Sequence, residues 1–367
     1  MSQTLSSPVK FDPSVETPSD GEAAAIQSLK DSFRYIQDTT SKDYGRAVRG
    51  VHAKGHGIVK GVLKVAAGLP PQLAQGLFAQ AGSHEAVMRF STAPGDILDD
   101  AISGPRGVAL KVLGVEGARL PGSEEDGDQD FLMVNGPVFG AATPKPFAKN
   151  LKLLAATTDK AEGLKKAWSA TLQVLEGALE AVGGKSMLLS ALGGAPETNP
   201  LGETYFTQTA YRYGDHIAKL SLVPVSPGLV AMTGDIVDTH GRPDALREEI
   251  GAVMVEQGGT WELRVQLCTD PEAMPVEDPT ILWDEKLSPF VTVATFEAKP
   301  QATWHHATSE PTEDRLSFSP WHCLAAHQPL GAVNRARRET YQQSASFRAG
   351  FNRCPVHDVK TLDDLPG

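Results

Sequence analysis

The pattern of hydrophobic and polar positions changes several times along this chain of 367 residues. Residues 22–40 repeat apolar positions with a helical period, which predicts an early helix. Further on, short runs rich in β-branched residues are separated by Gly, Pro and Asp, a texture typical of an antiparallel sheet or barrel. These runs are GIVKGVLKVA (57–66), AVMRFST (86–92), GVALKVLG (107–114), IAKLSLVPV (217–225), TWELRVQLCTD (260–270) and VTVATFEAKP (291–300).

The remaining segments complete the predicted organisation. Residues 146–193 carry Lys, Leu, Ala and Glu in a helical period, which predicts two helices inserted after the first strands. Residues 1–20 are rich in Ser, Pro and Asp and predict a flexible N-terminal arm. No internal repeat or linker divides the rest, so we expect one α+β domain over residues 21–367.

Composition and charge exclude several classes of function. The chain has 34 basic and 45 acidic residues and a formal net charge of −11, which argues against nucleic acid or an anionic membrane as a partner. Its three cysteines are irregularly spaced, as expected in a reducing compartment. The N-terminus lacks the pattern of a secretory signal, and no apolar run is long enough to span a membrane. We therefore expect a cytoplasmic protein.

A polar face on the last predicted helix is a candidate for chemistry. If residues 332–348 are helical, Asn334, Arg337, Tyr341 and Arg348 share one face of the helix. The two arginines would stabilise the phenolate form of the tyrosine, and a phenolate is a strong ligand for ferric iron. From spacing alone, a solvated helix face explains the same pattern.

The segment RGVHAKGHG, residues 49–57, is a second candidate. Its glycines would let a flat group lie close to the backbone near His52. His52 and His56 have the spacing of two metal ligands, but the glycines disfavour a helix and no third ligand follows. The glycines lack the lysine and hydroxyl of a phosphate-binding loop. A histidine hydrogen-bonded within a strand remains the simplest interpretation of this segment alone.

Taken in order, these segments resemble the haem catalase superfamily over roughly residues 45–350, and in particular its small, catalase-related peroxidase branch. The resemblance implies a catalase-like antiparallel β-barrel with flanking helices, a proximal C-terminal helix that carries the haem ligand, and haem b (iron protoporphyrin IX) as cofactor. The matching segments are RGVHAKGHG (49–57), RFST (89–92), GPRGVALKV (104–112), DFLMVNGPVF (130–139), YGDH (213–216), TWELRVQLCTDPEAMP (260–275) and the pattern RxxxY with an arginine seven residues after the tyrosine.

On the distal side of the haem, the resemblance implies that His52 is the acid–base residue and that Ser91 hydrogen-bonds it. Asn135 would be the distal asparagine, with a register that is open by one residue because the family usually has two adjacent asparagines. Phe139 would fall near an aromatic that packs on the haem. Val51 stands where allene oxide synthase-type relatives tend to have threonine, which favours peroxide removal.

On the proximal side, the resemblance implies that Tyr341 is the axial ligand of the haem iron. Arg337 would stabilise its phenolate, and Arg348 would join Arg49 and Arg89 in neutralising the haem propionates. His216 falls where the family has a histidine behind the proximal arginine, and Gly331 replaces an aspartate that usually precedes that arginine.

The resemblance therefore implies a catalase or peroxidase that decomposes hydrogen peroxide or small organic peroxides through a ferryl intermediate, with an organic reductant as a possible second substrate. The chain stops about twenty residues after the proximal helix, so the subunit interweaving of large catalases is not expected, although a homodimer is possible. Two alternatives stay open: a fatty-acid hydroperoxide isomerase or dehydratase of the allene oxide synthase type, and a haem-binding carrier or sensor without turnover.

Overall fold

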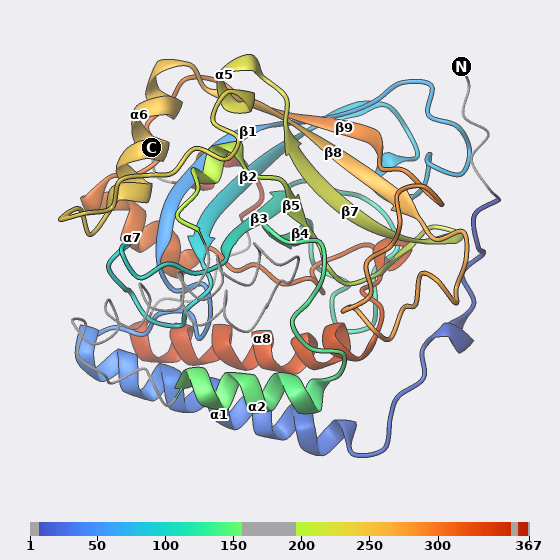
Figure 1. The fold of residues 1–367 in the computed structure, drawn as a ribbon, viewed down its shortest axis with the longest axis horizontal. Helices are drawn as coiled ribbons and strands as arrows, with labels where there is room; N and C mark the ends of the chain where they lie inside the picture. The colour runs from blue at the N-terminus through green and yellow to red at the C-terminus, as the bar shows by residue number, and fades with distance from the viewer. Residues whose placement is uncertain (1–6, 156–195, 354–358, 366–367) are drawn as a thin grey trace, which may run out of the picture.

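A computed structural model describes residues 7–155, 196–353 and 359–365 (Figure 1). Its strands form one antiparallel sheet in the order β5-β4-β3-β2-β1-β9-β8-β7-β6, and the pairing of β5 with β7 closes eight of them into a barrel. The predicted α+β barrel is therefore confirmed. The strands are β1 (Gly55–Val65), β2 (Gly82–Thr92), β3 (Arg106–Val112), β4 (Gln129–Val134), β5 (Tyr205–Phe206), β6 (Tyr211–Tyr213), β7 (His216–Pro224), β8 (Gly259–Leu267) and β9 (Val291–Ala298).

Three helices lie side by side against one side of the barrel: α1 (Glu22–Tyr44), α2 (Pro144–Ala155) and α8 (Ala332–Asn352) (Figure 1). Helices α1 and α8 match the helices predicted at each end of the chain. Helix α2 covers the start of the predicted insertion, and residues 156–193 lie outside the described residues. The other helices of the described residues are α5 (Pro227–Val230), α6 (Ala245–Glu256), α7 (His306–Arg315) and the short 3-10 turns Pro13–Val15, Gly76–Phe78, Pro200–Gly202, Ala325–His327 and Leu362–Asp364.

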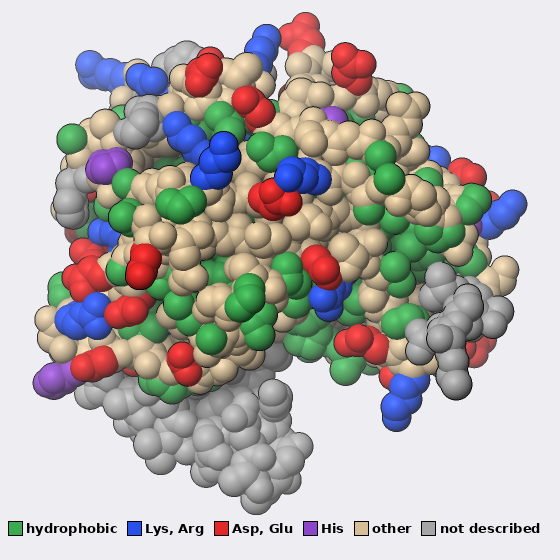
Figure 2. All heavy atoms as spheres, turned by 90° about the horizontal axis from the view of Figure 1, so that it is seen from above, with side chains coloured by type: hydrophobic (Ala, Val, Ile, Leu, Met, Phe, Trp, Pro, Cys, Tyr) green, Lys and Arg blue, Asp and Glu red, His purple; other side chains and the backbone are tan. Residues whose placement is uncertain are grey.

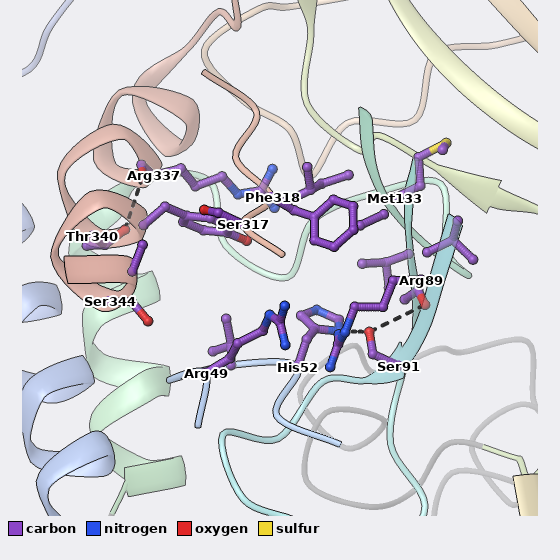
Figure 3. Close-up of a pocket in the computed structure, with 18 of the residues that line it drawn as sticks. Arg49, His52, Arg89, Ser91, Met133, Ser317, Phe318, Arg337, Thr340 and Ser344 are labelled. Atoms are coloured by element: carbon purple, nitrogen blue, oxygen red, sulfur yellow. Dashed lines mark hydrogen bonds between the residues drawn. The ribbon is translucent and has the colours of Figure 1, made fainter. Parts of the chain in front are cut away.

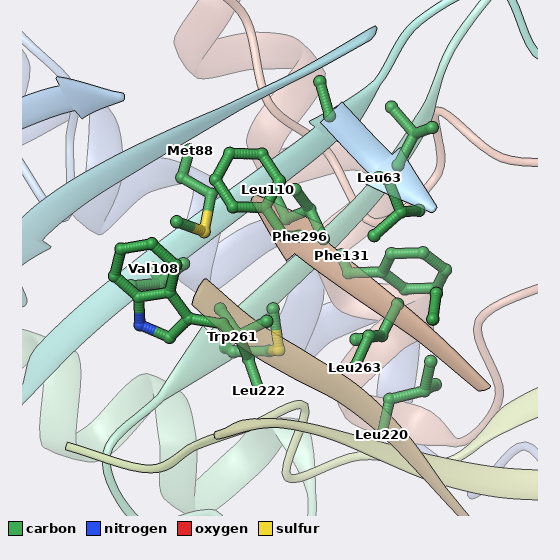
Figure 4. Close-up of a cluster of buried hydrophobic side chains, with 14 of the residues drawn as sticks. Leu63, Met88, Val108, Leu110, Phe131, Leu220, Leu222, Trp261, Leu263 and Phe296 are labelled. Carbon is green, nitrogen blue, oxygen red and sulfur yellow. The ribbon is translucent and has the colours of Figure 1, made fainter. Parts of the chain in front are cut away.

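Side chains fill the interior of the barrel. Leu63, Phe131, Trp261 and Phe296 are among the fully buried side chains of this core (Figure 4). Successive residues of a strand point to opposite faces. The even-numbered residues of β2, such as Met88 and Phe90, point into the barrel, so Arg89 lies on its outer face. The interior of the barrel is therefore filled by packed, mostly apolar side chains.

The described part of the predicted N-terminal arm is tied to the body of the protein. The backbone N–H of Val9 donates to the carbonyl of Cys268 at 2.8 Å, and that of Phe11 donates to the carbonyl of Asp215 at 2.7 Å. Residues 1–6 lie outside the described residues.

Carboxylates from distant segments hold the start of helix α8. Arg335, in its first turn, pairs with Glu22 at 2.7 Å and with Glu16 and Glu277 at 2.8 Å each. Glu277 also accepts the backbone N–H of Ala332 at 2.8 Å, one of the donors that a helix N-terminus leaves unpaired. This network positions the helix that carries Tyr341.

We expect Arg335→Ala to lower the free energy of unfolding by about 3 kcal/mol, because it leaves three carboxylates together without their shared cation. Burial already raises the pKa of Glu16. Loss of Arg335 raises the pKa of Glu16 further, so protonation at low pH should relieve the repulsion between the carboxylates. The loss in free energy of unfolding should therefore be smaller at pH 5 than at pH 8. Urea unfolding at both pH values measures this. Lys64→Ala, which removes an exposed pair with Glu297, is the control with little expected change. An equal deficit at both pH values would contradict the explanation.

The surface agrees with the charge of the sequence. On the face shown in Figure 2, Lys and Arg side chains are interspersed with Asp and Glu and do not form one basic area. Among the described residues, no helix is both long and apolar enough to cross a membrane.

Candidate active site

A cavity lies between the outer face of strands β2 to β4 and helix α8 (Figure 3). Segments more than two hundred residues apart contribute to it, and they bring together eight of the ten predicted site residues. The eight are Arg49, Val51, His52, Arg89, Ser91, Arg337, Tyr341 and Arg348.

The backbone and one ring nitrogen of His52 are both fixed. His52 lies before β1 rather than within a strand, in a left-handed conformation with φ of 52° that side chains rarely adopt. Its backbone N–H donates to the carbonyl of Ala93 at 2.9 Å, and its Nδ1 lies 3.0 Å from Oγ of Ser91. No described residue hydrogen-bonds Nε2, so this atom is the one available to a ligand.

Ser91 also offers a way to select the tautomer of this ring. Its hydroxyl lies 3.5 Å from the carbonyl oxygen of Gly107, which can only accept a proton. If the hydroxyl donates there, it accepts from an Nδ1–H of His52. The lone pair of the imidazole is then on Nε2, as a proton acceptor in the cavity requires.

The environment keeps His52 neutral. Burial, together with the smaller effects of the positive charges of Arg89, Arg337 and Arg49, lowers the pKa of His52 to about 3. The imidazole is therefore uncharged and able to accept a proton at any physiological pH.

This lowered pKa predicts a flat pH profile. We expect the second-order rate with peroxide to change by less than about threefold between pH 5 and 8. A histidine with its ordinary pKa of about 6.5 would be only ~3% neutral at pH 5 and would give a ~30-fold loss. Stopped-flow rates across this range decide between the two. In the unfolded chain, His52 has its ordinary pKa and binds a proton more readily than in the folded protein. The free energy of unfolding should therefore fall as the pH drops below about 6.5. Circular dichroism at each pH checks that the protein stays folded while the rates are measured.

A close approach of the backbone also positions His52. A Cβ on Gly107, in β3, would lie 2.5 Å from Cε1 and 2.6 Å from Nδ1 of the His52 ring, well inside van der Waals contact. Glycine is thus needed here for space rather than for a left-handed backbone.

Gly107→Ala is expected to push the ring away from Ser91, to lower the peroxide rate and to cost about 1–3 kcal/mol of stability through overpacking. Rate and urea unfolding should be measured together. Gly82→Ala, where a Cβ would meet nothing within 4 Å, serves as the control. A Gly107→Ala protein with an unchanged rate would show that the ring does not need this space.

Helix α8 supplies the opposite wall. Arg337 is buried, and its Nη1 donates to Oδ1 of Asn334 at 3.3 Å. The amide nitrogen of Asn334 donates to the carbonyls of Ala210 and Leu330 at 3.1 and 3.0 Å, which turns its oxygen toward the arginine. Tyr341 lines the cavity one turn further along the helix. The stabilisation of its phenolate by Arg337 stays a prediction.

The other two of the ten predicted site residues, Asn135 and Phe139, lie elsewhere, and so does His216, which was expected behind the proximal arginine. Nδ1 of His216 is 3.2 Å from the carbonyl oxygen of Val9, at the arm, whereas Asn334 supports Arg337. Asn135 does not line the cavity, because its Oδ1 accepts the backbone N–H of Arg106 at 2.8 Å. Phe139 lies beyond the lining, with the guanidinium of Arg337 5.4 Å from its ring centroid.

An acidic residue that the sequence did not indicate lies among the predicted arginines. Glu313, in α7, accepts from Nε of Arg89 at 2.7 Å and also pairs with Arg49. Burial alone would raise the pKa of Glu313, but the charges of Arg49, Arg89 and Arg348 outweigh it and lower the pKa to about 2. The carboxylate is therefore ionised, and three arginines with one glutamate leave two positive charges at this edge of the cavity.

Gln208 is a second lining residue outside the predictions. It is buried in a left-handed conformation with φ of 62°, and its amide nitrogen donates to the carbonyls of Gly136 and Val138 at 3.0 and 2.6 Å. It holds the loop after β4 against the cavity. No motif in the sequence marks it, because the left-handed backbone depends on the tertiary contact.

Comparison with solved structures finds catalases. A fungal catalase and catalase A from Saccharomyces cerevisiae each match with a TM-score of 0.60 and 19% identity over 88% of this chain. A bacterial catalase matches with a TM-score of 0.58 and 17% identity over 98% of it. No family model and no curated protein sequence matches the chain. The chain has the catalase fold and spans 64–66% of the length of these three catalases.

Proposed function

We propose that this chain binds haem b in the cavity and decomposes hydrogen peroxide or small organic peroxides as a catalase or peroxidase. One observation carries the proposal: a neutral imidazole and a tyrosine phenol, from segments far apart in the sequence, line one cavity whose edge holds three arginines. The catalase fold of the chain supports it.

The residues present fit such a cofactor. Tyr341 would hold the iron through its phenol oxygen, and Arg49, Arg89 and Arg348 would hold the two carboxylates. Nε of Arg348 is buried without a partner among the described residues, so this guanidinium has an unused donor. When bound, haem supplies a redox-active iron at which the O–O bond of a peroxide is broken.

The chain itself supplies the movement of protons. Nε2 of His52 can accept the proton of a peroxide's inner oxygen and return it to the outer oxygen, so that water or an alcohol leaves instead of an anion. An Nδ1–H that donates to Oγ of Ser91 would hold the ring in the tautomer that this requires. The side-chain oxygen of Asn135 accepts a backbone N–H, so His52 is the acid–base group of this proposal without help from Asn135. Asn135 could hold the second oxygen of a peroxide only if it gave up that hydrogen bond.

Product analysis separates this function from its alternatives. After reconstitution with haem, the purified protein should evolve oxygen from hydrogen peroxide or oxidise a phenolic reductant with it. Consumption of a fatty-acid hydroperoxide without reductant, yielding an isomerised or dehydrated product, would favour the allene oxide synthase-type activity. A stable haem complex inert toward all three substrates would favour a carrier or sensor and would overturn the proposal.

A further inference from the structure

The Glu313 carboxylate occupies donors of two of the three arginines in the cluster. Nε of Arg89 lies 2.7 and 2.8 Å from its two carboxylate oxygens, and Nη1 of Arg49 pairs with one of them. The carboxylate side chain is only 5% exposed. Its contacts are the charge-assisted kind that a bound carboxylate makes with arginine.

The end of helix α7 completes this set of acceptors. The carbonyl of Glu313 accepts from Arg49 at 3.1 Å and from Arg348 at 3.0 Å. The carbonyl of Leu316 accepts from the same two guanidinium groups at 2.9 and 3.3 Å. Carbonyls at a helix C-terminus carry partial negative charge, so the end of α7 attracts the guanidinium groups of Arg49 and Arg348 in addition to its side-chain carboxylate.

We infer that Glu313 is a built-in competitor for the carboxylates of haem, and that it must leave Arg49 and Arg89 before a propionate can bind them. This inference rests on the proposed function. The same guanidinium donors cannot serve two carboxylates, and two carboxylates at one buried cluster repel each other.

The construction of α7 suits such a displacement. Pro311 lies inside this helix of 10 residues and lacks a backbone N–H, so one helical hydrogen bond is missing two residues before Glu313. On the outer side, Glu310 pairs with Arg46 at 2.7 Å, away from the cluster. The last turn can therefore move without breaking the barrel.

Haem titration of the purified protein without cofactor tests the inference. We expect Glu313→Gln to bind haem on the order of 10-fold more tightly than the unchanged protein, because the competing charge is gone, and to take it up faster. Affinity is measured by the Soret absorbance and uptake by stopped flow. Glu310→Gln, on the same helix, is the matched control with unchanged affinity. Glu313→Asp keeps the charge on a shorter side chain, so its haem affinity should lie between those of the unchanged protein and Glu313→Gln. This variant also provides a test if Glu313→Gln does not fold.

A second readout needs no haem. In Glu313→Ala, sodium propionate should raise the melting temperature more than sodium chloride at equal ionic strength, because the small carboxylate replaces the missing one. The unchanged protein should respond equally to both salts. Equal or weaker haem binding by Glu313→Gln and Glu313→Asp, while the unchanged protein binds haem, would overturn the inference alone. Absence of haem binding by every variant and by the unchanged protein would overturn the proposed function, and the inference with it.

Discussion

Replacing His52 with glutamine is expected to lower the rate of peroxide decomposition by about 10²–10⁴-fold while haem binding is retained, since this is the usual contribution of a positioned acid–base group. Glutamine is close to histidine in size and polarity but cannot accept and return a proton at this position. This expectation depends on the pKa of His52, which is about 3, because a protonated imidazolium has no lone pair with which to accept a proton. The effect should therefore fall on the rate and leave the Soret absorbance almost unchanged.

Stopped-flow reaction of the reconstituted variant with hydrogen peroxide measures this loss. His240→Gln, in an exposed loop, is the matched control and should react like the unchanged protein. A His52→Gln protein that keeps a rate within about threefold of the unchanged protein would exclude His52 as the proton acceptor.

Replacing Tyr341 with phenylalanine is expected to abolish most of the peroxide activity and to weaken haem binding, because it removes one oxygen atom and keeps the ring. No described residue hydrogen-bonds the Tyr341 hydroxyl, so the stability of the protein without haem should change by less than about 0.5 kcal/mol. This separates the loss of a ligand from the loss of a fold. Tyr35→Phe, at a tyrosine that is 51% exposed on helix α1, is the matched control.

Haem titration and urea unfolding of both tyrosine variants provide the two measurements. If Tyr341→Phe unfolds at a much lower urea concentration without haem, the phenol has a structural role. If it binds haem with unchanged affinity and keeps its activity, another residue holds the iron.

The architecture was largely predictable because the physical signals are local. The alternation in strand β2 separates the inward Met88 and Phe90 from the outward Arg89, and this pattern depends only on the period of a strand. The spacing of Arg337, Tyr341 and Arg348 depends only on the period of a helix, and all three residues line the cavity.

The features that escaped prediction depend on tertiary contacts. Glu313 belongs to a polar segment that resembles a solvated helix, and only the fold turns it toward Arg89. Gly107 is one glycine among many until the His52 ring is found beside it. Asn135 matched a motif, but a backbone N–H of a neighbouring strand takes its oxygen. Sequence patterns report periodicity and residue type, whereas these three features depend on which surfaces meet.

The most direct test of a tyrosine-ligated haem in this cavity is the absorption spectrum of the purified protein titrated with haem, compared with that of Tyr341→Phe. The unchanged protein should bind one haem per chain and show the Soret and charge-transfer bands of a ferric phenolate, and the variant should lose those bands. No Soret complex in the unchanged protein, or a spectrum that Tyr341→Phe leaves unaltered, would contradict the assignment.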